Sequence, residues 1–270
     1  GIPVFEFPED AAMTLAGLVR QVERGNKPRG RRRRFKIDPA PAQRELSRAK
    51  TNDKGWVDPA ALGRVLRHYG IPMATTEHAK TPRSAARLAA KVGFPVCLKA
   101  DAPDLLHKSD LGGVRIGLTD ETSVLGAAQD IESRLRPEFA DLGFEIQSMA
   151  PGHRELLMGF RRDPAFGPVF AVGFGGVTVE VLRDVAVRVG PLLDGDPQDM
   201  LSGLRGTPLL DAFRGQPSID KKLVCSCLLR LAQLAEDLPE LAELEINPFI
   251  ADRVGGHSMG VDCRGQMTRT

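Results

Sequence analysis

The sequence lacks the features that would place it in a membrane, on a secretory route or around a metal cluster. No apolar run approaches the roughly 18–20 residues that a membrane helix needs, and the N-terminus has no signal-peptide pattern. The four cysteines, Cys97, Cys225, Cys227 and Cys263, form no CxxC pair and no metal-binding spacing. We therefore expect reduced, buried thiols in a cytoplasmic protein.

An excess of charge of one sign is also missing. The 37 Lys and Arg residues are offset by 35 Asp and Glu residues, which leaves a net charge of +2. This balance argues against a nucleic-acid binder defined by bulk charge. The exception is local: residues 25–43 are rich in Gly, Pro and Arg, and Arg31 to Arg34 form a basic run. We interpret 25–54 as a solvated basic linker, with contact to nucleic acid as the alternative.

Several common catalytic patterns do not occur. Neither GxxxxGK[ST] nor a GxGxxG after a strand is present, HExxH is missing, and no Ser-His-Asp spacing stands out. These absences exclude the P-loop, dinucleotide-binding and zinc-protease motifs as guides to function.

Apolar periodicity predicts helices and strands in mixed order within a chain long enough for one large domain or two smaller ones. The predicted helices cover 8–24, 58–69, 81–92, 121–135, 197–204 and 218–236. The predicted strands cover 73–77, 94–100, 114–118, 144–149, 154–163, 168–174, 177–182, 185–190, 242–251 and 258–263. The close strand spacing after residue 144 predicts an antiparallel sheet, and the lack of strict βαβ alternation favours an α+β fold in two lobes.

The first chemically interesting segment follows the strand 94–100. Lys99 ends that strand, where its ammonium could contact a phosphate or simply lie in solvent. A stretch reading His107-Lys108-Ser109-Asp110-Leu111-Gly112-Gly113 comes next. Gly112 and Gly113 let backbone N–H groups approach an anion closely. His107 could be a base, a nucleophile or an ordinary surface histidine.

The second segment is Glu245-Ile246-Asn247-Pro248. Alternation along a strand puts Glu245 and Asn247 on one face, and their oxygens suit a hard cation such as Mg²⁺. Asp262, on a later strand, could complete the site. The alternative is a plain strand end with an Asn-Pro turn.

These features occur in an order that resembles a known family. The matching stretches are FPVCLKADAPDLLHKSDLGGV, PGHRELLMGFRRDPAFGPVFAVGFGGVTVEVLRDVAVRVGPL and ELEINPF. From about Trp56 to Arg264 the chain resembles the ATP-grasp domain of the nucleoside-diphosphate- and ADP-forming acyl-CoA synthetases, relatives of the succinyl-CoA synthetase β subunit. The resemblance implies an ATP-grasp domain over 55–270, with a small lobe at about 55–140 and a large lobe at 141–270.

The resemblance also implies a reaction, acyl-CoA + ADP + phosphate ⇌ carboxylic acid + CoA + ATP, through a phosphohistidine. By that likeness His107 would take the phosphoryl group on its way to ADP. The resemblance implies that Lys99 binds the nucleotide phosphates and that Gly112 and Gly113 belong to the loop that covers them. It implies an adenine-binding hinge at Gln147, Ser148 and Met149, and a carboxylate at Glu155 that faces the nucleotide. It also implies that Asn247 and Asp262 are Mg²⁺ ligands, with Glu245 beside them.

Two further points come with the resemblance. The family hinge usually reads Gln-Glu-Met, so Ser148 replaces a carboxylate, which predicts altered nucleotide affinity with backbone contacts retained. Residues 1–24 resemble the end of the CoA-ligase α portion of fused members, and the chain does not begin with Met. We therefore expect a partial chain whose CoA, carboxylic acid and α-side histidine belong to an upstream portion or separate subunit. The alternative is a non-catalytic regulatory module like that of fused protein lysine acetyltransferases.

Overall fold

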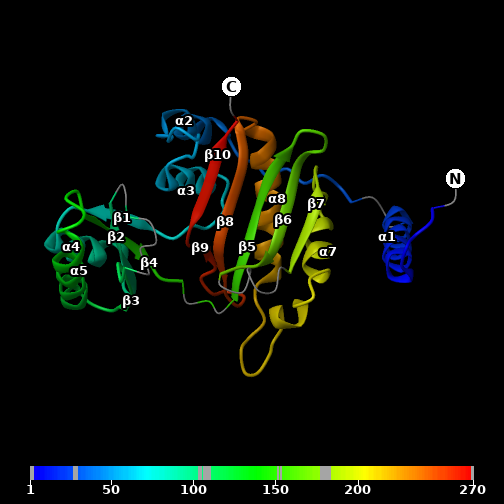
Figure 1. Ribbon diagram of the computed structural model, residues 1–270. Coiled ribbons are helices and arrows are strands. Elements are labelled where there is room, and N and C mark those ends of the chain that lie inside the picture. The colour runs from blue at the N-terminus through cyan, green and yellow to red at the C-terminus, as the bar shows by residue number, and fades with distance from the viewer. Residues whose placement is uncertain are drawn as a thin grey trace.

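The computed structural model describes residues 3–26, 30–102, 105, 111–150, 152, 154–176 and 184–268, and it has two lobes that are each built on a sheet (Figure 1). The helices are α1 (Pro8–Asn26), α2 (Ala40–Arg48), α3 (Pro59–His68), α4 (Pro82–Val92), α5 (Glu121–Leu135), α7 (Asp196–Ser202) and α8 (Lys221–Asp237), with a short 3₁₀ turn η1 (Thr207–Leu210). The strands are β1 (Thr76–Ala79), β2 (Val96–Asp101), β3 (Val114–Leu118), β4 (Gly143–Ser148), β5 (Arg154–Asp163), β6 (Gly167–Phe174), β7 (Val185–Val189), β8 (Leu241–Ala251), β9 (Met259–Gly260) and β10 (Cys263–Met267).

The small lobe is an antiparallel sheet in the order β1-β4-β2-β3, with α4 and α5 packed on one face. Both helices begin with a capping box, from Thr81 to Ser84 and from Asp120 to Ser123, which satisfies backbone N–H groups that have no partner inside the helix. Leu98 and Ile146 point into the core under these helices and are fully buried. Because side chains alternate along a strand, their neighbours on β2 and β4 face the opposite side, toward the large lobe.

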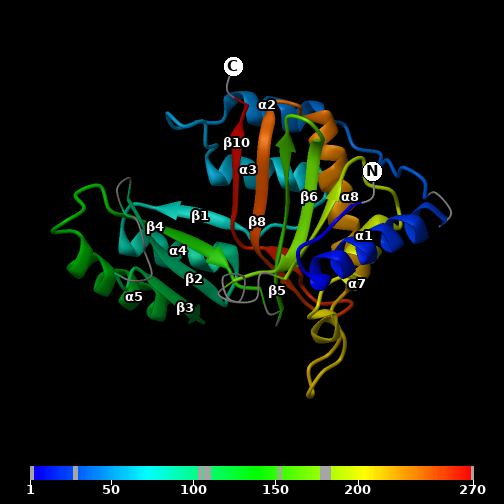
Figure 2. The same ribbon diagram turned by 45° about the vertical axis from the view of Figure 1, so that its right-hand side comes forward.

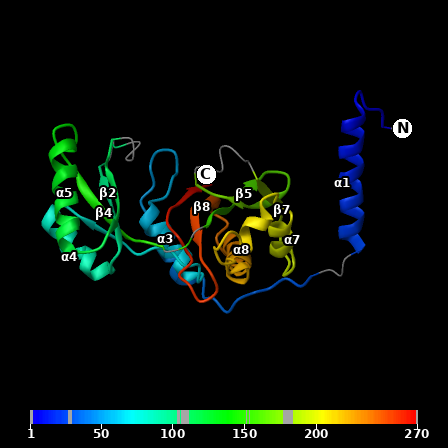
Figure 3. The same cartoon turned by 90° about the horizontal axis from the view of Figure 1, so that it is seen from below.

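The large lobe is an antiparallel sheet in the order β10-β8-β5-β6-β7, with β9 paired to β8. α3, α7 and α8 pack on one face, over a core that includes Leu156, Met158 and Phe249. Figures 1 and 2 place the small lobe beside the β10 edge and β7 at the far edge, and Figure 3 shows α8 under the strands. The other face of the sheet carries polar residues near β8. The predicted antiparallel sheet and the α+β two-lobe fold are therefore confirmed.

The lobe boundary differs from the prediction. β4 (143–148) was assigned to the large lobe, but it hydrogen-bonds to both β1 and β2 and so belongs to the small sheet. In the other direction, α3 packs into the large-lobe core through Leu62 and Leu66. The reason is that the chain crosses between lobes twice, once after α3 and once after β4. The predicted strand 177–182 lies outside the described residues.

The basic segment is not the solvated linker that its composition predicts. The backbone N–H of Phe35 donates to Gln233 Oε1 (2.7 Å), and Gln233 Nε2 donates to the Phe35 carbonyl (3.3 Å). Arg34 contacts Asp237 at 2.7 Å, and Arg32 pairs with Glu236. Residues 30–38, which we call the strap, thus lie along α8, and α2 follows them inside the range expected to be linker.

The thiols follow the prediction closely. All four cysteines are free; Cys97, Cys227 and Cys263 are buried and Cys225 is half-buried. Burial raises the pKa of Cys227 and of Cys263 to about 12, so both are protonated at neutral pH. Within the described ranges no helix combines the length and apolarity required to cross a bilayer.

Candidate functional site

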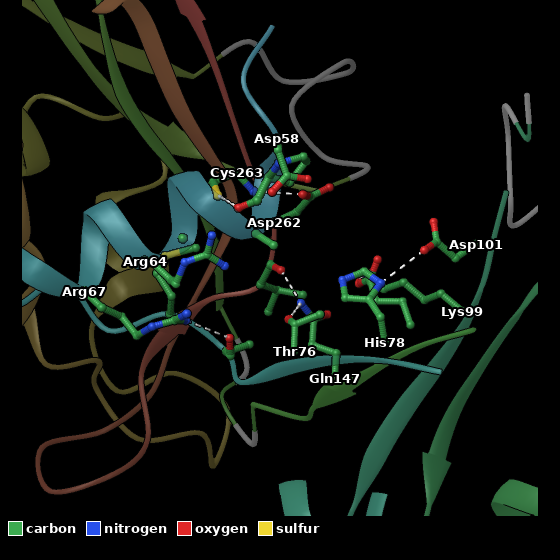
Figure 4. Close-up of a pocket in the computed structure, with 17 residues that line it drawn as sticks. Asp58, Arg64, Arg67, Thr76, His78, Lys99, Asp101, Gln147, Asp262 and Cys263 are labelled. Carbon is green, nitrogen blue, oxygen red and sulfur yellow. Dashed lines mark hydrogen bonds and ion pairs between the residues drawn. The ribbon is translucent and has the colours of Figure 1, made fainter. Parts of the chain in front are cut away.

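A cavity of about 410 Å³ lies between the two lobes (Figure 4). Its small-lobe wall is the open face of the sheet, and its large-lobe wall is the start of α3 and the segment before β10. The charged and polar residues that line it are Asp58, Arg64, Arg67, Thr76, His78, Lys99, Asp101, Glu145, Gln147 and Asp262. The cavity therefore brings together three residues singled out from the sequence, Lys99, Gln147 and Asp262, from three separate segments of the chain.

Lys99 lies in this cavity rather than at an edge in solvent. Its Nζ is 3.1 Å from Glu145 Oε1, and the two side chains are only 20% and 17% exposed. The pair exists because Lys99 and Glu145 are direct register partners on β2 and β4, on the face opposite the core. The lysine is thus a largely buried cation that already holds a carboxylate, in a position where an anionic ligand would compete for it.

A second charged pair lies on the same face. His78 Nδ1 is 3.1 Å from Asp101 Oδ2. The hydrogen bond that the His78 ring donates to the Asp101 carboxylate raises the pKa of His78, because it stabilises the imidazolium form. The sequence analysis missed His78, Asp101 and Glu145, although strand alternation places Asp101 on the same face as Lys99, and Glu145 on the same face as Gln147.

The α3 wall adds two arginines that the sequence analysis also missed. Arg64 and Arg67 are one helical turn apart and both line the cavity. Arg64 Nε is 2.9 Å from Glu45 Oε2, and Arg67 Nη1 donates to the Ala74 carbonyl at 3.3 Å. Burial lowers the pKa of the Arg67 guanidinium, although it remains a cation at neutral pH. The cavity therefore carries cations on both walls.

The predicted hinge residues connect the lobes. Gln147 Nε2 donates to the Val261 carbonyl (2.6 Å) and to Thr76 Oγ1 (3.2 Å), while its Oε1 is buried without a hydrogen-bond partner. Ser148 exchanges two bonds with Thr75: its N–H donates to the Thr75 carbonyl, and its hydroxyl accepts from the Thr75 N–H at 3.0 Å. The side chains of Gln147 and Ser148 are thus largely committed to holding the hinge.

Met149 continues the same hinge. Its N–H donates to the carbonyl of Pro95 (3.2 Å), and its sulfur accepts from the Gly117 N–H (3.0 Å). Ser148 and Met149 do not line the cavity, but both adjoin it through Gln147. The backbone N–H groups of both Ser148 and Met149 are therefore already engaged in hydrogen bonds within the protein.

The two loop glycines lie at the base of β3. Gly112 has φ +62°, and a Cβ on it would come within 2.7 Å of Arg134 Nη1, so a glycine is required there. Its carbonyl accepts from Arg115 (2.9 Å) and Arg134 (3.0 Å). The Gly113 carbonyl accepts from the N–H of Ala100 (2.6 Å), next to Lys99. The base of the loop is therefore fixed beside the end of β2, whereas His107 lies outside the described residues.

Glu245 and Asn247 do share one face of β8. Asn247 Nδ2 donates to Glu245 Oε1 (3.1 Å), and the Asn247 N–H donates to the Asp262 carbonyl (3.1 Å). Among the described residues no three His, Cys, Asp or Glu side chains gather closely enough to hold a metal ion. The oxygens available here are those of the Asn247 amide and of the Glu245 and Asp262 carboxylates.

Glu155, on β5, is connected to these residues through the glycines that follow β6. Gly175 N–H donates to the Glu155 carbonyl (2.7 Å), and Gly176 N–H donates to Asn247 Oδ1 (3.3 Å). A Cβ on Gly176 would collide with the Glu155 carboxylate. The Gly-Gly turn thus links Glu155 to Asn247, on the open face of the large sheet.

Comparisons with known proteins identify the family and the fold. Residues 48–265 match a family described as ATP-grasp domain. The 4-hydroxybutyrate–CoA ligase (ADP-forming) of Nitrosopumilus maritimus is 32% identical over 266 residues, which is 97% of this chain but only 38% of that protein. The acetate–CoA ligase (ADP-forming) I subunit beta of Pyrococcus furiosus is 34% identical over 216 residues, 78% of this chain and 92% of the subunit.

Two solved structures of Ca. Korarchaeum cryptofilum dinucleotide-forming acetyl-coenzyme A synthetase 1 superpose well. One, described with coenzyme A and Ca-AMPCP, has a TM-score of 0.74 at 31% identity and covers 86% of this chain and 100% of that chain. The other is described with Mg-AMPPCP and a phosphohistidine segment pointing towards the nucleotide site. It has a TM-score of 0.72 at 32% identity and covers 84% of this chain and 100% of that chain.

Proposed function

The chain belongs to the ATP-grasp family, as a β-subunit-like domain of the ADP-forming acyl-CoA synthetases, and from that premise we propose that it binds Mg-ATP or Mg-ADP between its lobes and exchanges the terminal phosphoryl group with His107. The observation that carries the proposal is the convergence of Lys99, Gln147 and Asp262 on one interlobe cavity. The overall reaction would be acyl-CoA + ADP + phosphate ⇌ carboxylic acid + CoA + ATP.

Lys99 would bind the nucleotide phosphates. Its ammonium is largely shielded from water and is held by the Glu145 carboxylate. A phosphate oxygen offers a stronger charge-assisted hydrogen bond in this setting, and the pair with Glu145 keeps Lys99 directed into the cavity until the nucleotide arrives. Gly112 and Gly113, fixed beside the end of β2, would bring backbone groups over the same phosphates.

The oxygens near β8 fit a magnesium ion that is shared with nucleotide phosphates. Asn247 contributes an amide oxygen, Asp262 a carboxylate, and Glu245 lies 3.1 Å from the Asn247 side-chain nitrogen. Hard oxygen ligands are what Mg²⁺ requires, and it is commonly held by one or two carboxylates together with substrate phosphates. The bound ion would neutralise phosphate charge during transfer.

His107 would serve as the phosphoryl acceptor. The chain that carries it leaves β2 at Asp101 and re-enters β3 at Val114, and these strands are antiparallel neighbours. Both ends of the segment are therefore anchored near Lys99. Imidazole is largely neutral near pH 7, as a nucleophile must be.

The complete reaction would need a CoA-binding ligase portion. This chain corresponds to 38% of the length of the Nitrosopumilus protein. α1 presents an exposed apolar side that neither hydrophobic core of the described residues covers, for example Leu15 and Leu18 at 62% exposure each. We propose that residues 1–24 end an upstream CoA-ligase-like region, and that the carboxylic acid and CoA bind to that portion.

The proposal is tested by labelling. The chain is incubated with Mg²⁺ and γ-labelled ATP, and we expect an acid-labile, base-stable phosphate that His107→Ala abolishes. His257→Ala is the matched control, because His257 lies in the turn after β8. ADP binding is measured in parallel by calorimetry. Failure of both ATP and ADP to bind at millimolar concentration would contradict the nucleotide site, and nucleotide binding without label on His107 would instead support the regulatory-module alternative.

A further inference from the structure

The open face of the large sheet carries a row of exposed valines at its far edge. Val185, Val187 and Val189 on β7 are 39%, 59% and 46% exposed, whereas Arg188 between them points to the other face and pairs with Asp196. We call Val185, Val187 and Val189 the valine row. Three β-branched apolar side chains in line on an outer strand mark an interaction surface, because such strands are otherwise protected by charge or cover.

The valine row shares its face with the proposed metal site. Glu245 pairs with Gly159, Gly159 with Ala171, and Ala171 with Val187, so one cross-strand line runs from β8 through β5 and β6 to β7. Three strand spacings amount to about 14 Å. A partner that covers the valine row would therefore reach the neighbourhood of Glu245 and Asn247 without any movement of the lobes.

A second apolar surface, on α1, is attached close to the first. Leu15, Leu18 and Val22 follow each other at helical spacing, and each is 62% exposed. Figures 1 and 3 show α1 apart from the sheets, on the side where β7 and α7 lie. A helix with such a stripe is stable only when another element covers it.

The strap limits where an element that packs on α1 can lie. Arg31 N–H donates to Asp194 Oδ1 (3.1 Å), and Asp194 N–H donates to the Arg31 carbonyl (3.0 Å). Asp194 follows β7 by five residues, and Arg32 lies beside Gly190 and Pro191 at the end of that strand. Four peptide links from Asn26 to Gly30 reach at most about 14 Å. Whatever folds around α1 is therefore tethered close to the end of β7, the strand that carries the valine row.

We propose that the valine row and the α1 stripe are two parts of one docking surface for the CoA-binding ligase portion, a proposal that rests on the proposed function. The matched family segment begins at residue 48, after α1 and the strap. The match to the Nitrosopumilus ligase, a much longer protein, covers 97% of this chain. The unmatched part is shorter than the 19 residues of α1, so the match includes at least part of this helix. α1 is thus matched in the longer enzyme but lies outside the segment that matches the ATP-grasp domain.

The chemistry of α1 agrees with a protein occupant. Its charged residues are the acidic Glu9, Asp10 and Glu23 and the basic Arg20 and Arg24. A helix that lies on a lipid surface has a basic polar face instead. The occupant that the observations favour is therefore a folded portion that packs on α1, lies against β6 and β7, and comes within reach of the phosphoryl group.

The test compares hydrogen exchange of this chain alone with two joined forms. In the first, the chain replaces the matching part of the Nitrosopumilus ligase; in the second, it is mixed with the companion subunit of the Pyrococcus acetate–CoA ligase I. We expect at least tenfold slower exchange over 185–189 in a joined form. Val187→Asp should remove that protection and lower acyl-CoA formation at least tenfold, while ADP binding to the isolated chain stays unchanged.

The matched control is Val254→Asp, because Val254 is 76% exposed in a turn remote from β7; it should change neither exchange nor turnover. Unchanged exchange over 185–189 in both joined forms overturns the proposal, whether the ligase portion binds elsewhere or not at all. Concentration-dependent protection in the isolated chain that Val187→Asp abolishes also overturns it, since the occupant is then a second copy. Loss of ADP binding by the unmodified chain would contradict the proposed function and not this surface.

Discussion

Lys99 and Glu145 face each other across neighbouring strands of the small lobe, with Nζ 3.1 Å from Oε1 and both side chains mostly buried. The Glu145 carboxylate thus binds the same ammonium group that, on the proposed function, binds the nucleotide phosphates. A nucleotide must therefore displace Glu145 from Lys99, and it must do so near a negative charge that remains in the cavity. On the proposed function, the Glu145 carboxylate therefore lowers the affinity of the cavity for nucleotide.

Glu145→Gln is expected to tighten ADP binding. The amide keeps the shape of the side chain but removes a charge that competes for Lys99 and repels phosphate, so we expect a gain of roughly three- to tenfold, in line with a partly buried charge-assisted bond. Calorimetric titration with Mg-ADP measures it. Glu77→Gln is the control, because Glu77 pairs with Lys91 at 2.8 Å on the helix-covered side. Equal or weaker ADP binding by Glu145→Gln would show that the carboxylate does not compete with the nucleotide for Lys99.

Lys99→Met is expected to weaken ADP binding by roughly 1.5–3 kcal/mol, the range for loss of a charge-assisted hydrogen bond. The double variant with Glu145→Gln separates two causes of that loss. If Glu145 acts only through Lys99, the gain from Glu145→Gln disappears in the Lys99→Met background. If the gain persists, Glu145 repels the nucleotide directly. No change on Lys99→Met alone would refute the role of the lysine.

The sequence predicts the local elements well because the local signals are strong. Helix 121–135 matches α5 at both ends, where Asp120 and Ser123 form the capping box. The strand with Lys99 and the face shared by Glu245 and Asn247 follow from alternation, and the structure places both as expected. Where period and caps agree, the chain has few other conformations of similar energy.

Long-range pairings could not be predicted in the same way. The sequence around residue 145 does not indicate that β4 pairs within the small sheet. Likewise, the sequence around Phe35 does not indicate that Gln233, 198 residues away, binds the Phe35 backbone. His78 and Asp101 likewise become partners only because β1 and β2 flank β4. A charged residue in a short strand looks like a solvated one until its neighbour across the sheet is known.

Asp262→Asn is expected to raise the Mg²⁺ concentration required for nucleotide binding by about tenfold, with little effect on folding. The change removes one hard anionic oxygen from the proposed cation site but keeps an oxygen acceptor for the Cys263 N–H, which now donates to Asp262 Oδ1 at 2.8 Å. Mg²⁺ is titrated at fixed ADP. Asp211→Asn, at an exposed pair with Lys221, is the control. An unchanged Mg²⁺ requirement would show that Asp262 is not a ligand of the cation.

The His78–Asp101 pair predicts a pH-dependent contribution to stability. Asp101 raises the pKa of His78 in the folded chain, so the folded state binds its proton more tightly than the unfolded chain does. The stabilisation is complete below the unfolded pKa of about 6.5 and is lost as the pH rises through the raised folded value. We expect Asp101→Asn to destabilise the chain more at pH 6 than at pH 8.5, measured by urea unfolding.

The control for that titration is Asp130→Asn. Asp130 pairs with Arg115 and Arg134 at 2.7 and 3.0 Å, and arginine does not titrate in this range. Its destabilisation should be the same at both pH values. An NMR titration of the His78 ring would show a lower pKa in Asp101→Asn, and an unshifted ring would refute the pairing.

Gln233→Ala is expected to release the strap from α8. Gln233 is 3% exposed and binds the Phe35 backbone in both directions. Its loss leaves the half-buried Phe35 N–H without that partner, while the Phe35 carbonyl still accepts from the Ile37 N–H at 2.9 Å. We therefore expect a cost of about 1–1.5 kcal/mol. Gln129→Ala on the exposed side of α5 is the matched control and should change stability by less than about 0.5 kcal/mol. Two readouts are combined: urea unfolding, and proteolysis at Arg31 to Arg34. These residues are exposed, but their backbone is held along α8 while Arg34 pairs with Asp237. Faster cleavage within the basic run, at unchanged ADP affinity, is the expected result. Equal cleavage of both variants would show that the strap is held by its arginine pairs alone, and that Gln233 serves only the packing of its own helix.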